Sequence, residues 1–175
     1  FSYVLDRVDV PCLLYNVPSR TGCALSEANV ARLSKHANAW GIKEASGDIA
    51  YATKIARYVG DDFTLWSGND DMIAPLLSLG GSGVISVWSN IAPQTVHNLV
   101  ADWHDGNPQK AREIQLANLD LIHALFCEVN PIPVKYALAE MGLLGENYRL
   151  PLWKLTDAHK ALLAAELKKA GILHA

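Results

Sequence analysis

The sequence lacks several features that mark particular classes of protein. Its three cysteines are odd in number and widely spaced, so we expect reduced thiols and a cytoplasmic location instead of a disulfide framework. The 15 lysines and arginines nearly balance the 18 aspartates and glutamates, and a net charge of −3 gives no basic footprint for nucleic acid. No apolar run approaches the roughly 18 residues that cross a bilayer, and no signal-peptide pattern opens the chain. We therefore expect neither a nucleic-acid partner nor a membrane association.

Sequence signatures of bound cofactors are missing as well. No G-x-G-x-x-G turn occurs, and the glycines of Leu79–Gly83 precede an expected strand, where they are typical of a helix stop and a loop. The six histidines show no metal-ligand spacing; His97 and His104, for example, are seven residues apart, with no nearby cysteine or glutamate in a ligand pattern. We expect no metal and no cofactor.

The chain contains instead a regular alternation of short apolar strands and helical patterns, and 50% of its residues are hydrophobic. Four consecutive βα units follow one another. The expected strands are Pro11–Val17, Trp40–Ala45, Phe63–Trp66 and Gly83–Trp88, and the expected helices are Ser26–His36, Ile49–Val59, Met72–Leu79 and Ala92–His104. Nearly continuous apolar strands joined by helices are typical of an α/β fold with a parallel sheet.

Two architectures fit this alternation: half of an eight-stranded (β/α)8 barrel, or a doubly wound open sheet. The missing glycine-rich turn favours the barrel, which four strands cannot close alone. We assign residues 1–106 to this half-barrel and residues 107–175 to a C-terminal helical region. Within that region we expect helices over 109–129, 133–144 and 156–170.

The first residues indicate that the chain lacks its natural N-terminus. Phe1 is not an initiator methionine, and a bulky phenylalanine is a poor candidate for a position exposed by methionine removal. The opening segment FSYVLDRVD is typical of the last turns of a helix and the loop that follows.

Lys43 is the most prominent candidate for a catalytic residue in the sequence. Side chains alternate along a strand, so Gly41, Lys43 and Ala45 share one face, and the two small residues leave space around the lysine. Desolvation in an apolar strand lowers the pKa of a lysine and yields the neutral amine that attacks a carbonyl to form a Schiff base. The alternative is a lysine at a strand end that reaches solvent or pairs with Glu44, and buried lysines are rare.

Two further side chains lie near the end of the preceding strand. Tyr15 would point into the mouth of a barrel, where its phenol can relay a proton; the alternative is an ordinary tyrosine of the core or rim. Arg20 follows in a turn-forming loop, where its guanidinium can hold a carboxylate in a bidentate manner, although most loop arginines are simply solvated.

Five segments, in order and at spacing consistent with the fold, resemble the second half of proteins of the dihydrodipicolinate synthase family. They are YNVPSRTG at Tyr15–Gly22, GIKEASGD at Gly41–Asp48, SGND at Ser67–Asp70, GGSGVISV at Gly80–Val87 and NPIPVK at Asn130–Lys135. The resemblance covers nearly the whole chain, and five ordered motifs are far more specific than any one of them. It therefore favours the nucleophilic interpretation of Lys43.

This resemblance implies a class I aldolase-type lyase on a (β/α)8 barrel, of the kind found in diaminopimelate and lysine biosynthesis. Lys43 would form an imine with pyruvate, and the derived enamine would attack L-aspartate-4-semialdehyde. Tyr15 aligns with the proton-relay tyrosine of the family and Arg20 with the arginine that holds the semialdehyde carboxylate. Ile85 matches the residue whose backbone carbonyl faces pyruvate, and Gly68 is placed with the substrate-binding residues. The family usually assembles as a homotetramer.

Two departures from the family leave alternatives open. Family members commonly carry two acids where this chain has Asn69 and Asp70, and the pyruvate-binding threonine loop and cross-subunit tyrosine of the family are absent from this chain. The chain is then either a portion of a longer synthase or an inactive half-barrel that acts only as an oligomerising module. Related pyruvate-dependent aldolases, such as N-acetylneuraminate lyase, share the lysine and tyrosine; the Ser19–Gly22 run favours the synthase.

Overall fold

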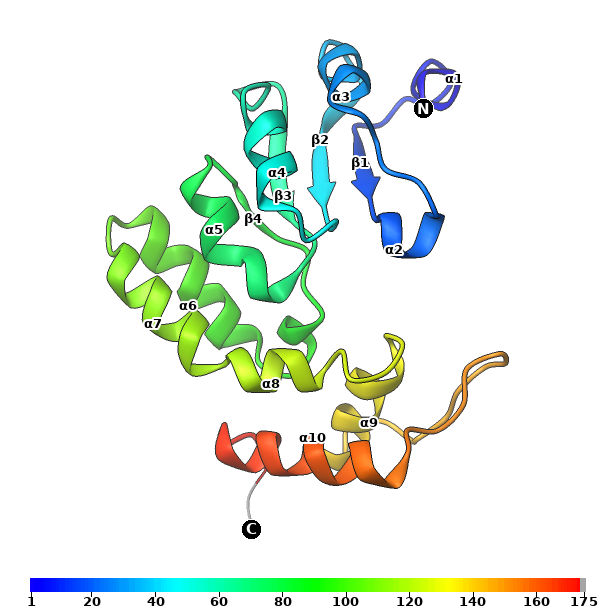
Figure 1. Ribbon diagram of the computed structural model, residues 1–175, viewed down its shortest axis with the longest axis vertical. Coiled ribbons are helices and arrows are strands. Elements are labelled where there is room, and N and C mark those ends of the chain that lie inside the picture. The colour runs from blue at the N-terminus through cyan, green and yellow to red at the C-terminus, as the bar shows by residue number, and fades with distance from the viewer. Residues whose placement is uncertain (174–175) are drawn as a thin grey trace. The chain divides into compact units, whose positions relative to one another are not determined.

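The computed structural model describes residues 1–173 and consists of two compact units, Phe1–Ser86 and a second unit that begins at Val87 (Figure 1). His174, one of the six histidines considered above, lies outside the described residues. The expected boundary between the half-barrel (1–106) and the helical region (107–175) marks the end of the βα units. The division into compact units does not test this boundary, so it stays a prediction.

The first unit contains a sheet of four parallel strands in the order β1-β2-β3-β4, which confirms the expected α/β class. The strands are β1 (Cys12–Asn16), β2 (Ala39–Glu44), β3 (Thr64–Ser67) and β4 (Gly83–Val84). The helices are α1 (Ser2–Leu5), α2 (Pro18–Thr21), α3 (Glu27–Leu33), α4 (Ile49–Ala56) and α5 (Ile73–Ser78), with a 3-10 turn η1 (Asp70–Met72) before α5.

The crossover helices begin where the sequence supplies N-caps. The Ser26 hydroxyl accepts a hydrogen bond from the Asn29 backbone N–H at 3.3 Å, and the Asp48 carboxylate accepts one from the Tyr51 N–H at 3.0 Å. Each cap satisfies a backbone donor that has no partner inside the first turn of its helix. The helices α3 and α4 therefore begin close to the positions expected from the sequence.

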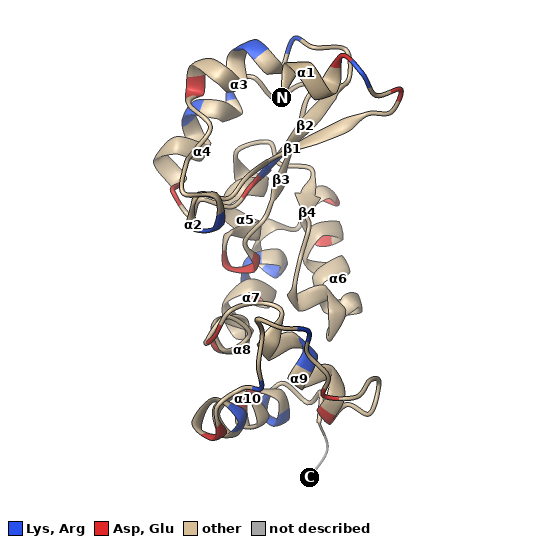
Figure 2. Cartoon of the chain, turned by 90° about the vertical axis from the view of Figure 1, so that its right-hand side faces the viewer, with Lys and Arg blue, Asp and Glu red and all other residues tan. Residues whose placement is uncertain are grey.

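The two faces of the sheet differ in character. Leu14, Ile42 and Leu65 are buried in one apolar core together with residues of α3, α4 and α5. Figure 2 shows α3 and α4 along one side of the strands. Because side chains alternate, the neighbouring residues Tyr15 and Lys43 lie on the opposite face. The helix-covered face thus stabilises the sheet, and the other face carries the polar groups of interest.

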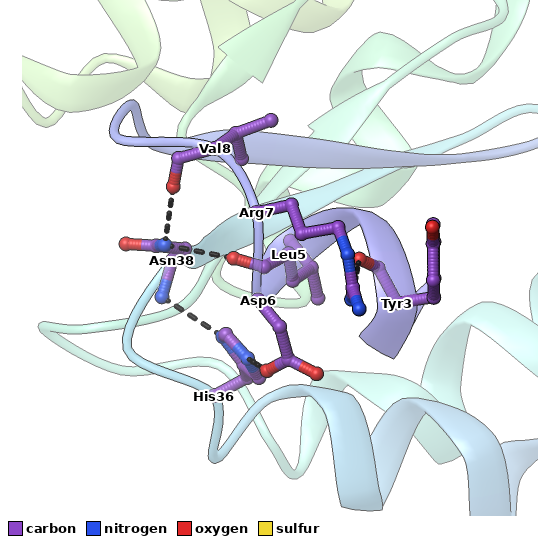
Figure 3. Close-up of polar contacts among 7 residues, drawn as sticks. All are labelled: Tyr3, Leu5, Asp6, Arg7, Val8, His36 and Asn38. Atoms are coloured by element: carbon purple, nitrogen blue, oxygen red, sulfur yellow. Dashed lines mark hydrogen bonds and ion pairs between the residues drawn. The ribbon is translucent and has the colours of Figure 1, made fainter.

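The amino ends of β1 and β2 are tied together through Asn38, which lies directly before β2 (Figure 3). The side-chain NH2 group of Asn38 donates to the carbonyl of Leu5 at 2.9 Å and to that of Val8 at 2.8 Å. Its backbone N–H donates to Nδ1 of His36 at 3.1 Å, and Nε2 of His36 lies 2.9 Å from a carboxylate oxygen of Asp6. This network fixes the chain as it enters both strands.

The fourth strand is shorter than the sequence predicts. The expectation of a strand over Gly83–Trp88 is wrong, because β4 ends at Val84 and Trp88 belongs to a 3-10 turn. Trp88 is fully buried, so its apolar character reflects core packing and not strand pairing. Ile85 lies just beyond β4, and its backbone N–H still donates to the Ser67 carbonyl at 2.9 Å.

Among its described residues, the second unit contains helices and connecting loops and no strand. It contains the 3-10 turn η2 (Trp88–Asn90) and the helices α6 (Pro93–His104), α7 (Pro108–Ala117), α8 (Leu119–Ala124), α9 (Ile132–Glu140) and α10 (Asp157–Lys169). The expected single helix over 109–129 is wrong, because Asn118 leaves helical geometry at φ −108° and ψ 6° and separates α7 from α8. Along residues 1–173, no helix combines the length and apolar character that a membrane crossing requires.

Candidate active site

Tyr15 and Lys43 occupy directly paired positions on neighbouring strands, β1 and β2. The Lys43 ammonium nitrogen lies 4.2 Å from the centroid of the Tyr15 ring. Tyr15 is 42% exposed and Lys43 is half-buried, so both groups are accessible to a small molecule. The two residues that sequence reasoning singled out separately, 28 positions apart by number, are therefore in contact.

Gly68 leaves the space that the Lys43 side chain occupies. A Cβ atom on Gly68 would lie 3.0 Å from Cε of Lys43 and 2.6 Å from Cβ of Ala45. The Gly68 backbone N–H donates to the Glu44 carbonyl at 2.7 Å, which draws this part of the chain against β2. The glycine expected among the substrate-binding residues thus contacts the lysine stem directly.

Arg20 and Ile85 follow the carboxyl ends of their strands. Arg20 lies on α2, a single helical turn directly after β1, and Gly22 closes that turn at φ 70°, a left-handed conformation that glycine adopts without strain. Ile85 follows β4 and is 41% exposed. Because carboxyl ends of parallel strands meet at one edge of a sheet, all five candidate residues belong to that edge.

A buried polar pair that sequence reasoning did not single out lies beneath Tyr15 and Lys43. Asn16 and Glu44 are the next register pair, and only 2% and 3% of their surfaces are exposed. Nδ2 of Asn16 donates to Oε2 of Glu44 at 2.7 Å. The sequence did contain an indication of this pair, because a polar residue directly follows both Tyr15 and Lys43 on a strand face that is otherwise apolar.

The negative charge of Glu44 also affects its surroundings. Burial of the Tyr51 phenol, together with the Glu44 and Glu27 carboxylates, raises the pKa of Tyr51 to about 12. The Tyr51 hydroxyl, on α4, therefore stays protonated at neutral pH. It adds no negative charge to the helix-covered side of the sheet.

The residues of the described chain do not form a metal centre. No group of three or more histidine, cysteine, aspartate or glutamate side chains converges within residues 1–173. The chemistry that the site offers comes from an amine, a phenol and a guanidinium. These groups can attack a carbonyl, move a proton and bind a carboxylate.

Fold and site together define an α/β protein that presents an accessible lysine in contact with a tyrosine at the carboxyl edge of a parallel sheet. Residues 1–170 match the model of the Dihydrodipicolinate synthetase family, and the chain belongs to this family. The 4-hydroxy-tetrahydrodipicolinate synthase of Alkaliphilus oremlandii is 44% identical over 173 residues, an alignment that covers 99% of this chain and 60% of that protein.

Solved structures give the same result. The dihydrodipicolinate synthase of Thermotoga maritima superposes with a TM-score of 0.95 at 42% identity, over 98% of this chain and 59% of that one. The chloride-inhibited dihydrodipicolinate synthase of Acinetobacter baumannii, complexed with pyruvate, superposes with a TM-score of 0.93 at 38% identity, over 98% and 59% of the two chains. The chain spans about three fifths of the length of these relatives.

Proposed function

We propose that the protein containing this chain is a Schiff-base-forming lyase that condenses pyruvate with L-aspartate-4-semialdehyde to give 4-hydroxy-tetrahydrodipicolinate. The observation that carries this proposal is the contact between Lys43 and Tyr15, at 4.2 Å from amine to ring centroid, beside the space left by Gly68. Membership of the family supports the choice of reaction. The place in metabolism would be diaminopimelate and lysine biosynthesis.

In the proposed reaction the Lys43 amine attacks the carbonyl carbon of pyruvate, and water leaves as the imine forms. Loss of a proton from the pyruvate methyl group gives an enamine, whose carbon attacks the aldehyde of the semialdehyde. The semialdehyde amino group then attacks the imine carbon and releases the Lys43 amine as the ring closes. Tyr15 carries protons in these steps, and Arg20 binds the semialdehyde carboxylate. The backbone carbonyl of Ile85 faces the bound pyruvate.

We further propose that the four βα units form half of a (β/α)8 barrel, with Lys43 and Tyr15 on the inner face. This proposal is supported by the uncovered character of that face, because a parallel sheet is normally buried on both faces. Trp40 is 45% exposed and packs against Trp66 at 5.8 Å between ring centroids. In a complete barrel such side chains fill the interior. A homotetramer in the cytoplasm is the proposed assembly and location.

The nucleophile is tested by incubating the protein with pyruvate and borohydride, followed by intact-mass measurement and peptide mapping. We expect one reduced pyruvate adduct per chain, on the peptide that contains Lys43. The variant Lys43→Arg should lose the adduct, whereas Lys54→Arg, a matched change on α4, should retain it. An adduct on another lysine would contradict the assignment of Lys43. No adduct on a 19.1 kDa chain would favour the alternative of an inert half-barrel that acts as an oligomerising module.

Arg20 distinguishes the synthase from a related pyruvate aldolase such as N-acetylneuraminate lyase. The variant Arg20→Ala should weaken use of the semialdehyde by about 10- to 100-fold, because a charge-assisted bidentate contact is lost, and should leave pyruvate trapping at Lys43 nearly unchanged. The measurement is steady-state kinetics with each substrate varied in turn. Equal losses for both substrates would contradict the role assigned to Arg20.

A further inference from the structure

A chain of three hydrogen bonds crosses the sheet directly behind the Tyr15–Lys43 pair. The Leu25 backbone N–H donates to Oδ1 of Asn16 at 2.9 Å, and Nδ2 of Asn16 donates to Oε2 of Glu44 at 2.7 Å. The Ser46 backbone N–H donates to Oε1 of Glu44 at 2.5 Å. These bonds join the carboxyl ends of β1 and β2 to the loops that follow both strands.

The direction of this hydrogen-bond chain is fixed by its two ends. Both terminal groups, the N–H of Leu25 and the N–H of Ser46, are backbone donors and cannot accept. Asn16 must therefore turn its carbonyl oxygen to Leu25 and its NH2 group to Glu44, and Glu44 must accept on both oxygens. Because the side chains of Asn16 and Glu44 are almost fully buried, water cannot replace a lost partner at no cost.

We propose that Asn16 and Glu44 are positioning residues for the reaction at Lys43, an inference that rests on the function proposed above. Tyr15 and Lys43 are each one residue earlier on the same strands and point to the opposite face. If β1 shifted by one residue against β2, Tyr15 would turn to the helix-covered side. The Glu44 carboxylate would then lie without its partner among apolar side chains. The buried pair thus holds the two strand ends in the register that keeps the phenol beside the amine.

Two single substitutions should each leave this hydrogen-bond chain with one mismatch. In Glu44→Gln, the new NH2 group faces either the Ser46 N–H or the Asn16 NH2 group; if Asn16 flips, its own NH2 group faces the Leu25 N–H. In Asn16→Asp, two carboxylate groups face each other. The double variant Asn16→Asp/Glu44→Gln exchanges the two chemical groups and restores all three bonds, with an aspartate that accepts from Leu25 and from the glutamine.

The experiment compares the wild-type protein, both single variants and the double variant, each as the full protein that contains this chain. Borohydride trapping with pyruvate, carried to completion, counts the sites that form the imine at Lys43. Turnover with aspartate semialdehyde is then expressed per trapped site, which removes any contribution from unfolded protein. We expect each single variant to fall by about 10- to 100-fold per trapped site, and the double variant to return to within about threefold of wild type.

Asn38→Asp provides a matched control at the other end of the same strands. This substitution also replaces a partly buried amide donor by an acceptor, here facing the carbonyls of Leu5 and Val8. It should lower the stability of the protein without lowering turnover per trapped site. If a variant at Asn16 or Glu44 does not fold, Asn16→Ser repeats the test, since it leaves the bond between Ser46 and Glu44 intact; we expect reduced turnover per trapped site.

The outcomes separate the positioning role from the proposed function. Absence of a Lys43 adduct in the wild-type protein would overturn the proposed function and this inference with it. A wild-type adduct with unchanged turnover per trapped site in both single variants, or in Asn16→Ser, would overturn the positioning role alone. Failure of a folded double variant to recover would also overturn it, because the hydrogen-bond chain would then not be the cause of the losses.

Discussion

The two ends of the parallel sheet use the same kind of side chain for different purposes. At the amino end, Asn38 donates to two backbone carbonyls and ties the segment before β1 to the segment before β2 (Figure 3). At the carboxyl end, Asn16 is bonded to a buried carboxylate, directly behind Tyr15 and Lys43. The amino end therefore contributes stability, and the carboxyl end additionally orients groups that carry chemistry, as expected for a parallel α/β sheet.

Gly41, near the amino end of β2, should give the largest effect on stability. A Cβ atom there would lie 2.3 Å from the Thr64 carbonyl oxygen and 2.4 Å from the Thr64 hydroxyl. Gly41→Ala must therefore push β2 from β3, and we expect a loss of about 3 kcal/mol or more in the free energy of unfolding. Denaturant titration measures this, with Gly60→Ala as control, since nothing lies within 4 Å of a Cβ atom there. Equal stability of the two variants would contradict the close approach of the strands.

Gly68, at the carboxyl end, should show a smaller loss of stability and a marked loss of activity. Its substitution by alanine places Cβ 3.0 Å from Cε of Lys43, which must move away. We expect turnover per trapped site to fall by about 10-fold, because the amine is displaced from its reacting position. The measurement is the trapping and turnover assay described above. A loss of stability without a loss of turnover would place Gly68 with the amino-end group of residues.

Asn38→Asp should cost about 1–3 kcal/mol in the free energy of unfolding, since an acceptor would face two carbonyl oxygens in a partly buried setting. Equilibrium denaturation gives this value. The comparison between the two ends fails if turnover per trapped site falls in Asn38→Asp as much as in Asn16→Asp.

The smallest expected effect lies in the helical unit. Glu128 accepts hydrogen bonds from the Thr156 N–H, the Thr156 hydroxyl and Nδ1 of His159, at the start of α10. The His159 bond first, and then those from Thr156, lower the pKa of Glu128 from 4.5 to about 2. A lowered pKa in the folded state stabilises above pH 4.5, and this contribution is lost as the pH falls toward 2.

Thermal unfolding at several pH values tests this assignment. Glu128→Gln should slightly lower the Tm at neutral pH, and the difference from wild type should disappear as the pH approaches 2. Glu113→Gln, an exposed substitution on α7, serves as the control. A Tm difference that persists unchanged at pH 2 would show that the Glu128 charge does not stabilise the start of α10.

The sequence predicted the alternation of strands and helices well, because apolar runs and N-caps such as Ser26 and Asp48 are local signals. The fourth strand and the long helix after residue 108 were wrong for a common reason. The apolar residues around Trp88 are buried by packing and not by strand pairing, and helical periodicity alone does not show that Asn118 interrupts the helix. Both depend on contacts that a local pattern does not contain.

By itself, the sequence determined the α/β class, the family resemblance and the candidates Lys43 and Tyr15, because hydrophobic periodicity and short motifs can be read from neighbours along the chain. Only the tertiary structure decided that Tyr15 and Lys43 are paired, that Gly68 contacts the lysine stem and that Asn16 bonds to Glu44. The physical reason is register: which residues of two parallel strands face each other is set by a crossover of more than 20 residues and its packing, and not by neighbours along the chain.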